Sequence, residues 1–297
     1  MAAFALALTA LALSAPALSA PAAQATAPDD DNPIVVTATA EQELKDFVDA
    51  LTPKSGQQGQ LARFERSVCP LAAGVSATQK EAIGKRMRDV AKAAGLKAGG
   101  ADCSPNVLVL IVNDKKATIE KLAKQYPDVS GDLTSKQWRE LLNSTAPAVA
   151  WHLKGPPINA DGHELGETAG GFYINRTGRA GSRITSATHP QFSAAVVVID
   201  SSALQGLTTT QVADYAAMRG FLDIDPEKIE DSSIPTILTI LSAPDNAEIP
   251  VTLTNWDLEA LRGYYSANRN VSVTAQRSEI RDSVQQKAAG GDKPVNR

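Results

Sequence analysis

The string GHELGE, residues 162–167, comes close to a metal-binding pattern. A zinc helix of the H-E-x-x-H type places two ligands one helical turn apart, and here His163 is followed at that spacing by Glu167. Gly162 and Gly166 oppose a rigid helix, because each interior glycine costs a helix about 1 kcal/mol relative to alanine. We therefore predict a loop without a metal site here.

Three arginines, Arg176, Arg179 and Arg183, lie in the glycine-rich segment 155–185 of a chain that is otherwise acidic. Guanidinium groups bind carboxylate and phosphate oxygens through paired hydrogen bonds. The alternative is solvated loop charge, since spacing within a loop does not fix a common face. We take the three arginines as candidate ligand-binding residues.

The remaining histidines, His152 and His189, are isolated in the sequence. A lone histidine is more often a satisfied polar residue than a ligand. No nucleophile elbow, phosphate-binding loop or dinucleotide fingerprint accompanies them. We expect no catalytic residue, no metal and no cofactor. The competing hypothesis is a hydrolase in which His163 or His189 acts with acids of the glycine-rich segment.

Apolar residues at helical spacing predict the helices that would surround these side chains. They fall in residues 41–51, 78–97, 115–126, 135–142, 207–220 and 253–265, with a terminal helix in 272–297. In the helix at 253–265, Thr254 and Asp257 are spaced as a capping box.

Continuous apolar runs predict two central strands at 107–112 and 194–199, buried on both faces. Residues 148–153 alternate as a strand with one buried face, and residues 61–68 alternate less regularly. Because strands and helices mix without a repeat, we predict an α+β fold with a mixed β-sheet flanked by helices.

Residues 190–266 resemble the back half of zincin-type metalloproteases, in which a buried strand precedes the metal helix H-E-x-x-H-x-x-G-x-x-H. The resemblance rests on the strings QVADYAAMRGFLD and LTNWDLEALRGYY. Aligned on Gly220, the ligand positions hold Ala213, Ala217 and Asp223, and the general-base position holds Asp214. It implies a zincin-like fold whose catalytic apparatus is absent; the alternative is an ordinary helix with a small-residue face.

Residues 1–25 have the apolar, alanine-rich character of a signal peptide, with a cleavage site at Ala23-Gln24-Ala25. We expect a periplasmic or secreted protein without an integral membrane segment after cleavage; an uncleaved anchor is the alternative.

In that compartment the only two cysteines, Cys69 and Cys103, should form a disulfide, which stabilises the fold by about 3–4 kcal/mol in the chain-entropy model. The alternative is a pair of buried free thiols.

A net charge of −4 with both signs interspersed argues against a nucleic-acid partner, because phosphate binding needs a clustered basic face.

Between the leader and the first helix, residues 26–40 form an acidic linker that contains PIVVTAT. This string resembles the TonB box of TonB-dependent outer-membrane receptors, which TonB captures by strand addition.

The TonB-box resemblance implies TonB or a TonB-dependent receptor as partner, bound through Ile34, Val35, Val36 and Thr37. The alternative is that residues 34–39 add an edge strand to the protein's own sheet or remain a disordered linker.

We expect residues 41–270 to form one α+β domain, followed by a C-terminal helix and tail at 271–297. The strings RFERSVCP, CSPNVLVLIV and ADYAAMRG resemble a group of uncharacterised secreted proteins of Gram-negative bacteria. The sequence thus predicts an exported, non-catalytic binding or accessory protein associated with TonB-dependent systems. A secreted, peptidase-like hydrolase with its site around the glycine-rich segment is the alternative.

Overall fold

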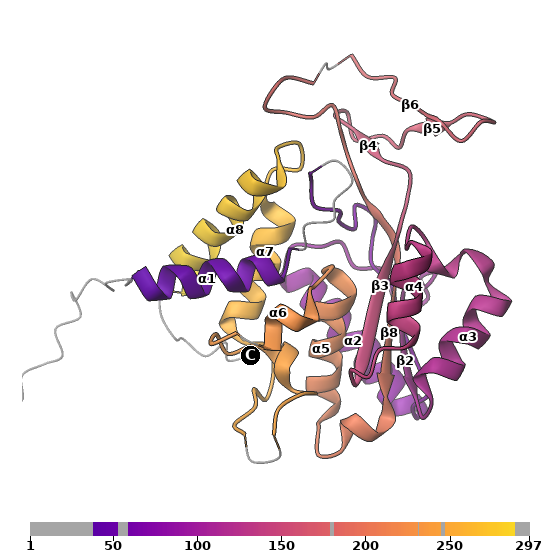
Figure 1. Ribbon diagram of the computed structural model, residues 1–297, viewed down its shortest axis with the longest axis vertical. Helices are drawn as coiled ribbons and strands as arrows, with labels where there is room; N and C mark the ends of the chain where they lie inside the picture. The colour runs from indigo at the N-terminus through magenta and orange to yellow at the C-terminus, as the bar shows by residue number, and fades with distance from the viewer. Residues whose placement is uncertain (1–37, 53–58, 179–180, 231, 245–246, 289–297) are drawn as a thin grey trace, which may run out of the picture. The chain divides into compact units, whose positions relative to one another are not determined.

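A four-stranded mixed sheet forms the centre of the fold (Figure 1). The structure, a computed structural model, describes residues 38–52, 59–178, 181–230, 232–244 and 247–288. The strands follow the order β1 (Pro70–Ala73), β2 (Val107–Val112), β8 (Phe192–Asp200) and β3 (Ala148–Lys154). The first three are parallel and β3 is antiparallel to β8. The predicted α+β class, a mixed sheet flanked by helices, is confirmed.

Helices cover both faces of this sheet (Figure 1). Helices α2 (Ala77–Ala93) and α5 (Thr209–Phe221) pack on one face, and α3 (Lys115–Gln125) and α4 (Ser135–Leu142) lie on the other. Strand β2 alternates between fully buried residues toward α2 and α5 and half-buried residues toward α3 and α4. The prediction of burial on both faces therefore holds for β8 at 195–199, whereas β2 is fully buried on one face only.

The other α-helices lie on the side of α2 and α5 and are α1 (Ala38–Ala50), α6 (Pro226–Glu230), α7 (Asn255–Ser266) and α8 (Val273–Ala288). Among the 3₁₀ helices, Pro127–Ser130 packs against α3 and β3, Ser201–Leu204 follows β8, and Ile237–Thr239 packs against α5. Helix α8 packs on α7 and α1. The predicted capping box of α7 is confirmed, with Thr254 and Asp257 bonded reciprocally. Buried Asp257 also accepts from Thr236 and from the backbone of Ile237, which ties the start of α7 to the preceding loop.

Residues 155–191 connect β3 to β8 and extend beyond the end of the sheet; we call them the arm (Figure 1). Two short antiparallel pairs organise the arm. They are β4 (Ile158–Asn159) with β7 (Thr188–His189), and β5 (Gly166–Glu167) with β6 (Tyr173–Ile174). The glycine-rich segment is thus a strand-containing projection of the β3–β8 connection.

The predicted strand at 61–68 is wrong. Only the isolated bridges Arg63–Gln191 and Val68–Ala98 occur in that range, and β1 begins later, at Pro70. The backbone of Leu61 donates instead to the side chain of Gln276. Tyr264 of α7 donates to the carbonyl oxygen of Ala62, and Phe192 of β8 donates to that of Arg63. Several elements thus satisfy this segment in place of a single strand partner.

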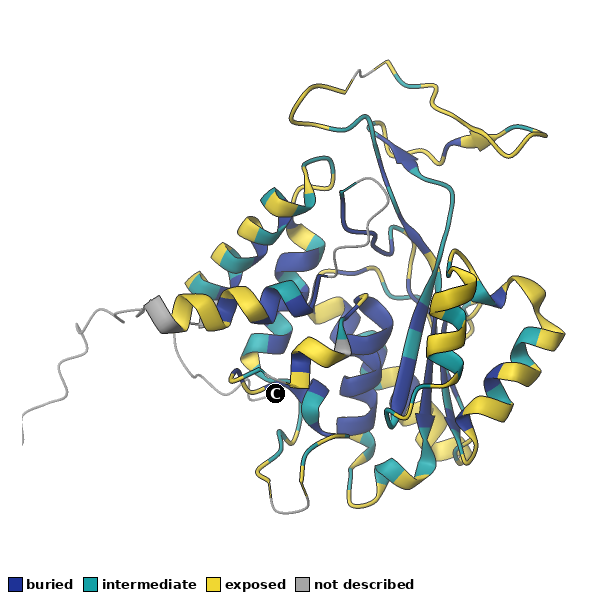
Figure 2. Ribbon diagram, in the orientation of Figure 1, coloured by how far each residue is buried: buried dark blue, intermediate teal, exposed yellow. Residues whose placement is uncertain are grey.

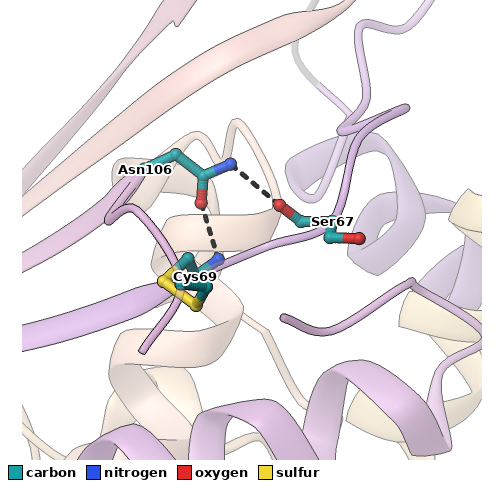
Figure 3. Close-up of a disulfide and its surroundings, with 4 residues drawn as sticks. Ser67, Cys69 and Asn106 are labelled. Atoms are coloured by element: carbon teal, nitrogen blue, oxygen red, sulfur yellow. Dashed lines mark hydrogen bonds between the residues drawn. A yellow bond between two sulfur atoms is a disulfide. The ribbon is translucent and has the colours of Figure 1, made fainter. Parts of the chain in front are cut away.

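The predicted disulfide between Cys69 and Cys103 is present, with the two Cα atoms 5.9 Å apart. Each cysteine lies shortly before a strand, so the bond joins the starts of the parallel neighbours β1 and β2. Asn106 reinforces the same junction (Figure 3). Its side chain accepts from the backbone of Cys69 at 2.6 Å and donates to the backbone of Ser67 at 3.0 Å.

The predicted signal peptide at 1–25, the predicted partner-binding residues Ile34, Val35, Val36 and Thr37, and the tail after Ala288 lie outside the described residues. Ala38 and Thr39, predicted to extend the TonB-box-like strand, instead begin α1. Within the described ranges, no helix combines the length and apolar character that crossing a bilayer requires.

We expect replacement of Cys103 by serine to lower the free energy of unfolding by about 3–4 kcal/mol, because the cross-link restricts the unfolded chain. Denaturant unfolding measures this change. Alkylation of the non-reduced protein should label neither thiol in mass spectrometry, and labelling of both would contradict the disulfide.

Neighbouring glycines provide a matched pair for the same junction. A Cβ atom at Gly99 would lie 2.7 Å from Sγ of Cys103, whereas one at Gly100 would meet nothing within 4 Å. We expect Gly99→Ala to destabilise by about 1–3 kcal/mol. Gly100→Ala should stay within about 0.5 kcal/mol of the wild type. Equal melting of the two variants would contradict the described packing.

Candidate functional site

Strand β3 forms one edge of the sheet, and its free edge is the candidate site. The backbone N–H of Asp200 donates to the carbonyl oxygen of Pro147 at 2.9 Å, so these two opposite residues form a hydrogen-bonded pair. This pair determines which residues of β3 are hydrogen-bonded to β8, because hydrogen-bonded pairs occur at every second position. Alternation then directs the N–H and C=O groups of Val149 and Trp151 toward β8. The corresponding groups of Ala148, Ala150 and His152 point away from the sheet.

Pairing on the other side of β8 agrees with this assignment. Ala195 donates to Asn106, so odd-numbered residues of β8 pair with β2 and even-numbered ones with β3. No hydrogen bond from a described residue reaches the outward N–H or C=O of Ala148 or Ala150. Since unpaired strand edges are templates for pairing with another chain, this edge can accept an extended segment.

A groove of 560 Å³ runs along this free edge; we call it the edge groove. One wall comes from residues 132–141 and the other from the end of α5 and the start of α6. Wall residues include Thr134, Gln137 and Leu141 on one side and Arg219, Asp223, Ile224 and Glu227 on the other. The unpaired backbone of β3 therefore borders a recess large enough for side chains of a bound segment.

Side chains of β3 anchor the strand on both faces. Trp151 donates its indole N–H to the backbone of Val129 at 2.6 Å and meets Trp138 of α4 edge to face. On the opposite face, His152 stacks on Phe192 and places Nε2 3.0 Å from the carbonyl oxygen of Gly220. The edge is thus held in an extended conformation before any ligand binds, which lowers the entropic cost of binding.

The ring of His152 is enclosed, although the residue as a whole is only half-buried. Burial lowers its pKa, because the protein interior disfavours the charged form. We assign the proton to Nε2, since the carbonyl of Gly220 can only accept. His152 is therefore a neutral donor that ties β3 to α5, which leaves no free proton-transfer role for Nε2.

The edge groove carries more negative than positive charge. Its four carboxylates are Asp132, Glu140, Asp223 and Glu227, and its two cations are Lys154 and Arg219. Lys154 lies 3.8 Å from Asp132, and Arg219 lies over the ring of Tyr215. Asp223 and Glu227 are exposed and form no ion pair with a described residue. Such a groove favours basic ligands.

Helix α5 is buried along its length (Figure 2). At the zincin-like positions, Ala213 and Ala217 are fully buried. Gly220 permits close packing, because a Cβ atom there would lie 2.9 Å from Cγ1 of Val107. The packing of α5 on the sheet accounts for these small residues without reference to a metal helix.

Asp214, at the general-base position of the zincin-like pattern, is inaccessible to solvent. Arg86 donates to both of its oxygens, at 2.6 and 3.0 Å. Thr252 and the backbone of Leu253 donate to the same carboxylate, at 2.6 and 2.9 Å. The partner Asp214 raises the pKa of Arg86. Asp214 therefore acts as a structural anchor between α2, α5 and the loop before α7.

The side chains of GHELGE do not lie on a helix. Glu164 pairs with Arg66 at 2.7 Å, and Glu167 belongs to β5. His163 is exposed on the arm. In the part of the chain that the structure describes, no three His, Cys, Asp or Glu side chains are grouped to hold a metal ion.

His189 is buried between two polar neighbours. Its Nδ1 lies 3.0 Å from Asn270 and its Nε2 lies 3.6 Å from Glu65, which Arg269 holds at 2.8 Å. No hydroxyl group of the described residues is hydrogen-bonded to this ring. Glu65 and Asn270 therefore explain His189 structurally, and the hydrolase hypothesis gains no nucleophile from it.

The candidate ligand-binding residues Arg176 and Arg183 lie on the arm, away from the walls of the edge groove. Arg176 and Arg183 are exposed, and Arg179 lies outside the described residues. Sequence reasoning identified 148–153 as a strand but missed the edge groove. The alternating pattern of β3 could not indicate that one of its edges lacks a partner, because strand order is a tertiary property.

Comparison of the chain with protein families, with curated proteins and with solved structures found no match.

The lowered pKa of His152 makes stability depend on pH. In the unfolded chain the His152 ring binds a proton near pH 6.5, whereas in the folded protein its lowered pKa keeps it neutral at that pH. The contribution of His152 to the free energy of unfolding is therefore complete above about pH 6.5 and decreases as the pH falls below that value. The slope from this group reaches at most about 1.4 kcal/mol per pH unit. Urea unfolding between about pH 7.5 and 5.5 measures it.

His152→Gln should remove this part of the pH dependence, and His163→Gln, at an exposed position, should retain it. An unchanged pH profile in the His152→Gln protein would contradict the proposed neutral, buried state.

Proposed function

We propose that this chain is an exported, non-catalytic protein that binds an extended peptide segment by strand addition to β3. The observation that carries the proposal is the unpaired backbone of Ala148 and Ala150 along a 560 Å³ groove. In strand addition the main chain supplies affinity, and pockets for alternate side chains supply specificity.

The charge of the edge groove supports a ligand with basic side chains. Asp223 and Glu227 on one wall, and Glu140 on the other, can attract Lys or Arg at alternate positions of a bound strand. The protein's own acidic segment DDDNPIVVTAT fits this groove poorly, because its carboxylates would meet like charge.

An extracytoplasmic compartment fits the alanine-rich leader and the disulfide. We place the protein in the periplasm or among secreted proteins on those grounds. The zincin-like fold without ligands is likewise our proposal, supported by the order of β8, α5 and α7. TonB is left out, because Ile34–Thr37 lie outside the described residues and Thr39 is helical.

A matched pair of variants tests strand addition. Ala150→Pro removes the outward N–H and should leave the β8 ladder intact, whereas Ala150→Ser keeps that N–H. The probe is a library of seven-residue peptides with Lys or Arg at every second position. We expect enriched peptides to bind wild type and Ala150→Ser with a Kd on the order of micromolar.

Ala150→Pro should weaken this binding at least about tenfold, the worth of a lost hydrogen bond. N-methylation of the peptide nitrogens that face β3 should abolish binding. N-methylation of the intervening nitrogens, which face away from β3, should preserve it. Equal binding to Ala150→Pro, or no enrichment on folded wild type, would overturn the proposal.

A further inference from the structure

We propose that the arm docks the protein on an anionic lipid surface. This inference goes beyond peptide binding, because it concerns a different face of the molecule and a different ligand. It rests on the exposed apolar side chains of the arm, on the arginines of residues 168–187 and on the projection of the arm from the sheet (Figures 1 and 2).

Large apolar side chains are concentrated on the arm. Phe172 and Ile184 are 75% and 80% exposed, and Tyr173 and Ile174 are 45% and 42% exposed. Elsewhere in the described residues, only Tyr126 and Val251 are large apolar residues of comparable exposure. Exposed apolar surface that gathers on one projection marks an interaction site.

The same stretch is basic. From Thr168 to Ala187 the sequence contains Arg176, Arg179 and Arg183 and no Asp or Glu, on a chain of net charge −4. The arm also contains three carboxylates: Asp161 bonds to Thr177, Glu164 pairs with Arg66, and Glu167 of β5 lies opposite Tyr173 of β6. Three arginines and three carboxylates leave the arm as a whole formally neutral, so the positive charge belongs to residues 168–187.

A bilayer surface matches this combination. Aromatic residues favour the boundary between headgroups and acyl chains, and arginine can bury its stem while its guanidinium reaches lipid phosphate. Each basic residue near an anionic surface contributes about 1 kcal/mol. A protein partner fits less well, because β5 and β6 have two residues each and offer little edge for strand addition.

The experiment is co-sedimentation of the exported protein with sucrose-loaded vesicles made of equal parts phosphatidylglycerol and phosphatidylcholine. Removal of two charges in Arg176→Gln/Arg183→Gln should lower the partition coefficient roughly 30-fold. Replacement of apolar groups in Phe172→Ser/Ile184→Ser should lower it at least about tenfold. Vesicles of phosphatidylcholine alone should bind much less.

Matched controls change the same chemistry elsewhere. Lys121→Gln/Lys124→Gln removes two exposed charges from α3, and Val251→Ser replaces a side chain that is 78% exposed. Both should bind vesicles as the wild type does. Equal binding of the arm variants, or no sedimentation of the wild type, would overturn the inference.

Two further measurements separate this inference from its alternatives. If sedimentation velocity shows that the arm variants abolish a dimer while vesicle binding is unchanged, the arm is a protein interface and the inference is wrong. Ala150→Pro should keep full vesicle binding, and the arm variants should keep peptide binding, so either proposal can fail without the other.

Discussion

Strand β8 is hydrogen-bonded to a parallel neighbour on one side and to an antiparallel neighbour on the other. These two pairings determine how the chain must connect the strands of the sheet. Parallel pairing with β2 requires the intervening chain to cross over the sheet, and the chain between these strands supplies α3 and α4 as the cover of one face. Antiparallel pairing with β3 places the end of β3 beside the start of β8. A two-residue turn could join them, yet the chain inserts residues 155–191 there. The connection of β3 to β8 does not require the arm, which is therefore an insertion.

Burial of polar groups links the helical layer to this sheet. Asp214 and Asp257 are both inaccessible, and each has its oxygens occupied by several donors. Burial raises the pKa of Asp257, while the donors around it act in the opposite direction. Carboxylates held in this way connect loops to helix starts, and removing a partner would leave a buried charge uncompensated. Because the oxygens of Asp214 on α5 and Asp257 on α7 already accept hydrogen bonds, these two carboxylates connect parts of the fold and are unsuited to act as bases.

Local signals were sufficient to predict much of this fold. The capping pair Thr254 and Asp257 marks a helix start, and the apolar runs of β2 and β8 mark central strands, because these features depend on neighbours in sequence. The segment at 61–68 is not a strand, because residues 61–64 are all buried and its backbone bonds to side chains of both α7 and α8. Neither the edge position of β3 nor the acidic walls of the edge groove could be predicted, because only tertiary packing brings Glu140 and Asp223 to the same groove.

The edge groove and residues 168–187 of the arm carry opposite charge, although the groove borders β3 and the arm follows β3 in the chain. A basic peptide suited to the edge groove would also be attracted to the anionic surface that suits the arm, because both attractions have the same electrostatic origin. Direct binding of that peptide to Arg176 or Arg183 is unfavourable, since like charges repel. A protein docked by its arm would therefore meet its peptide ligands where the lipid surface concentrates them, with the arm and the edge groove occupied at the same time.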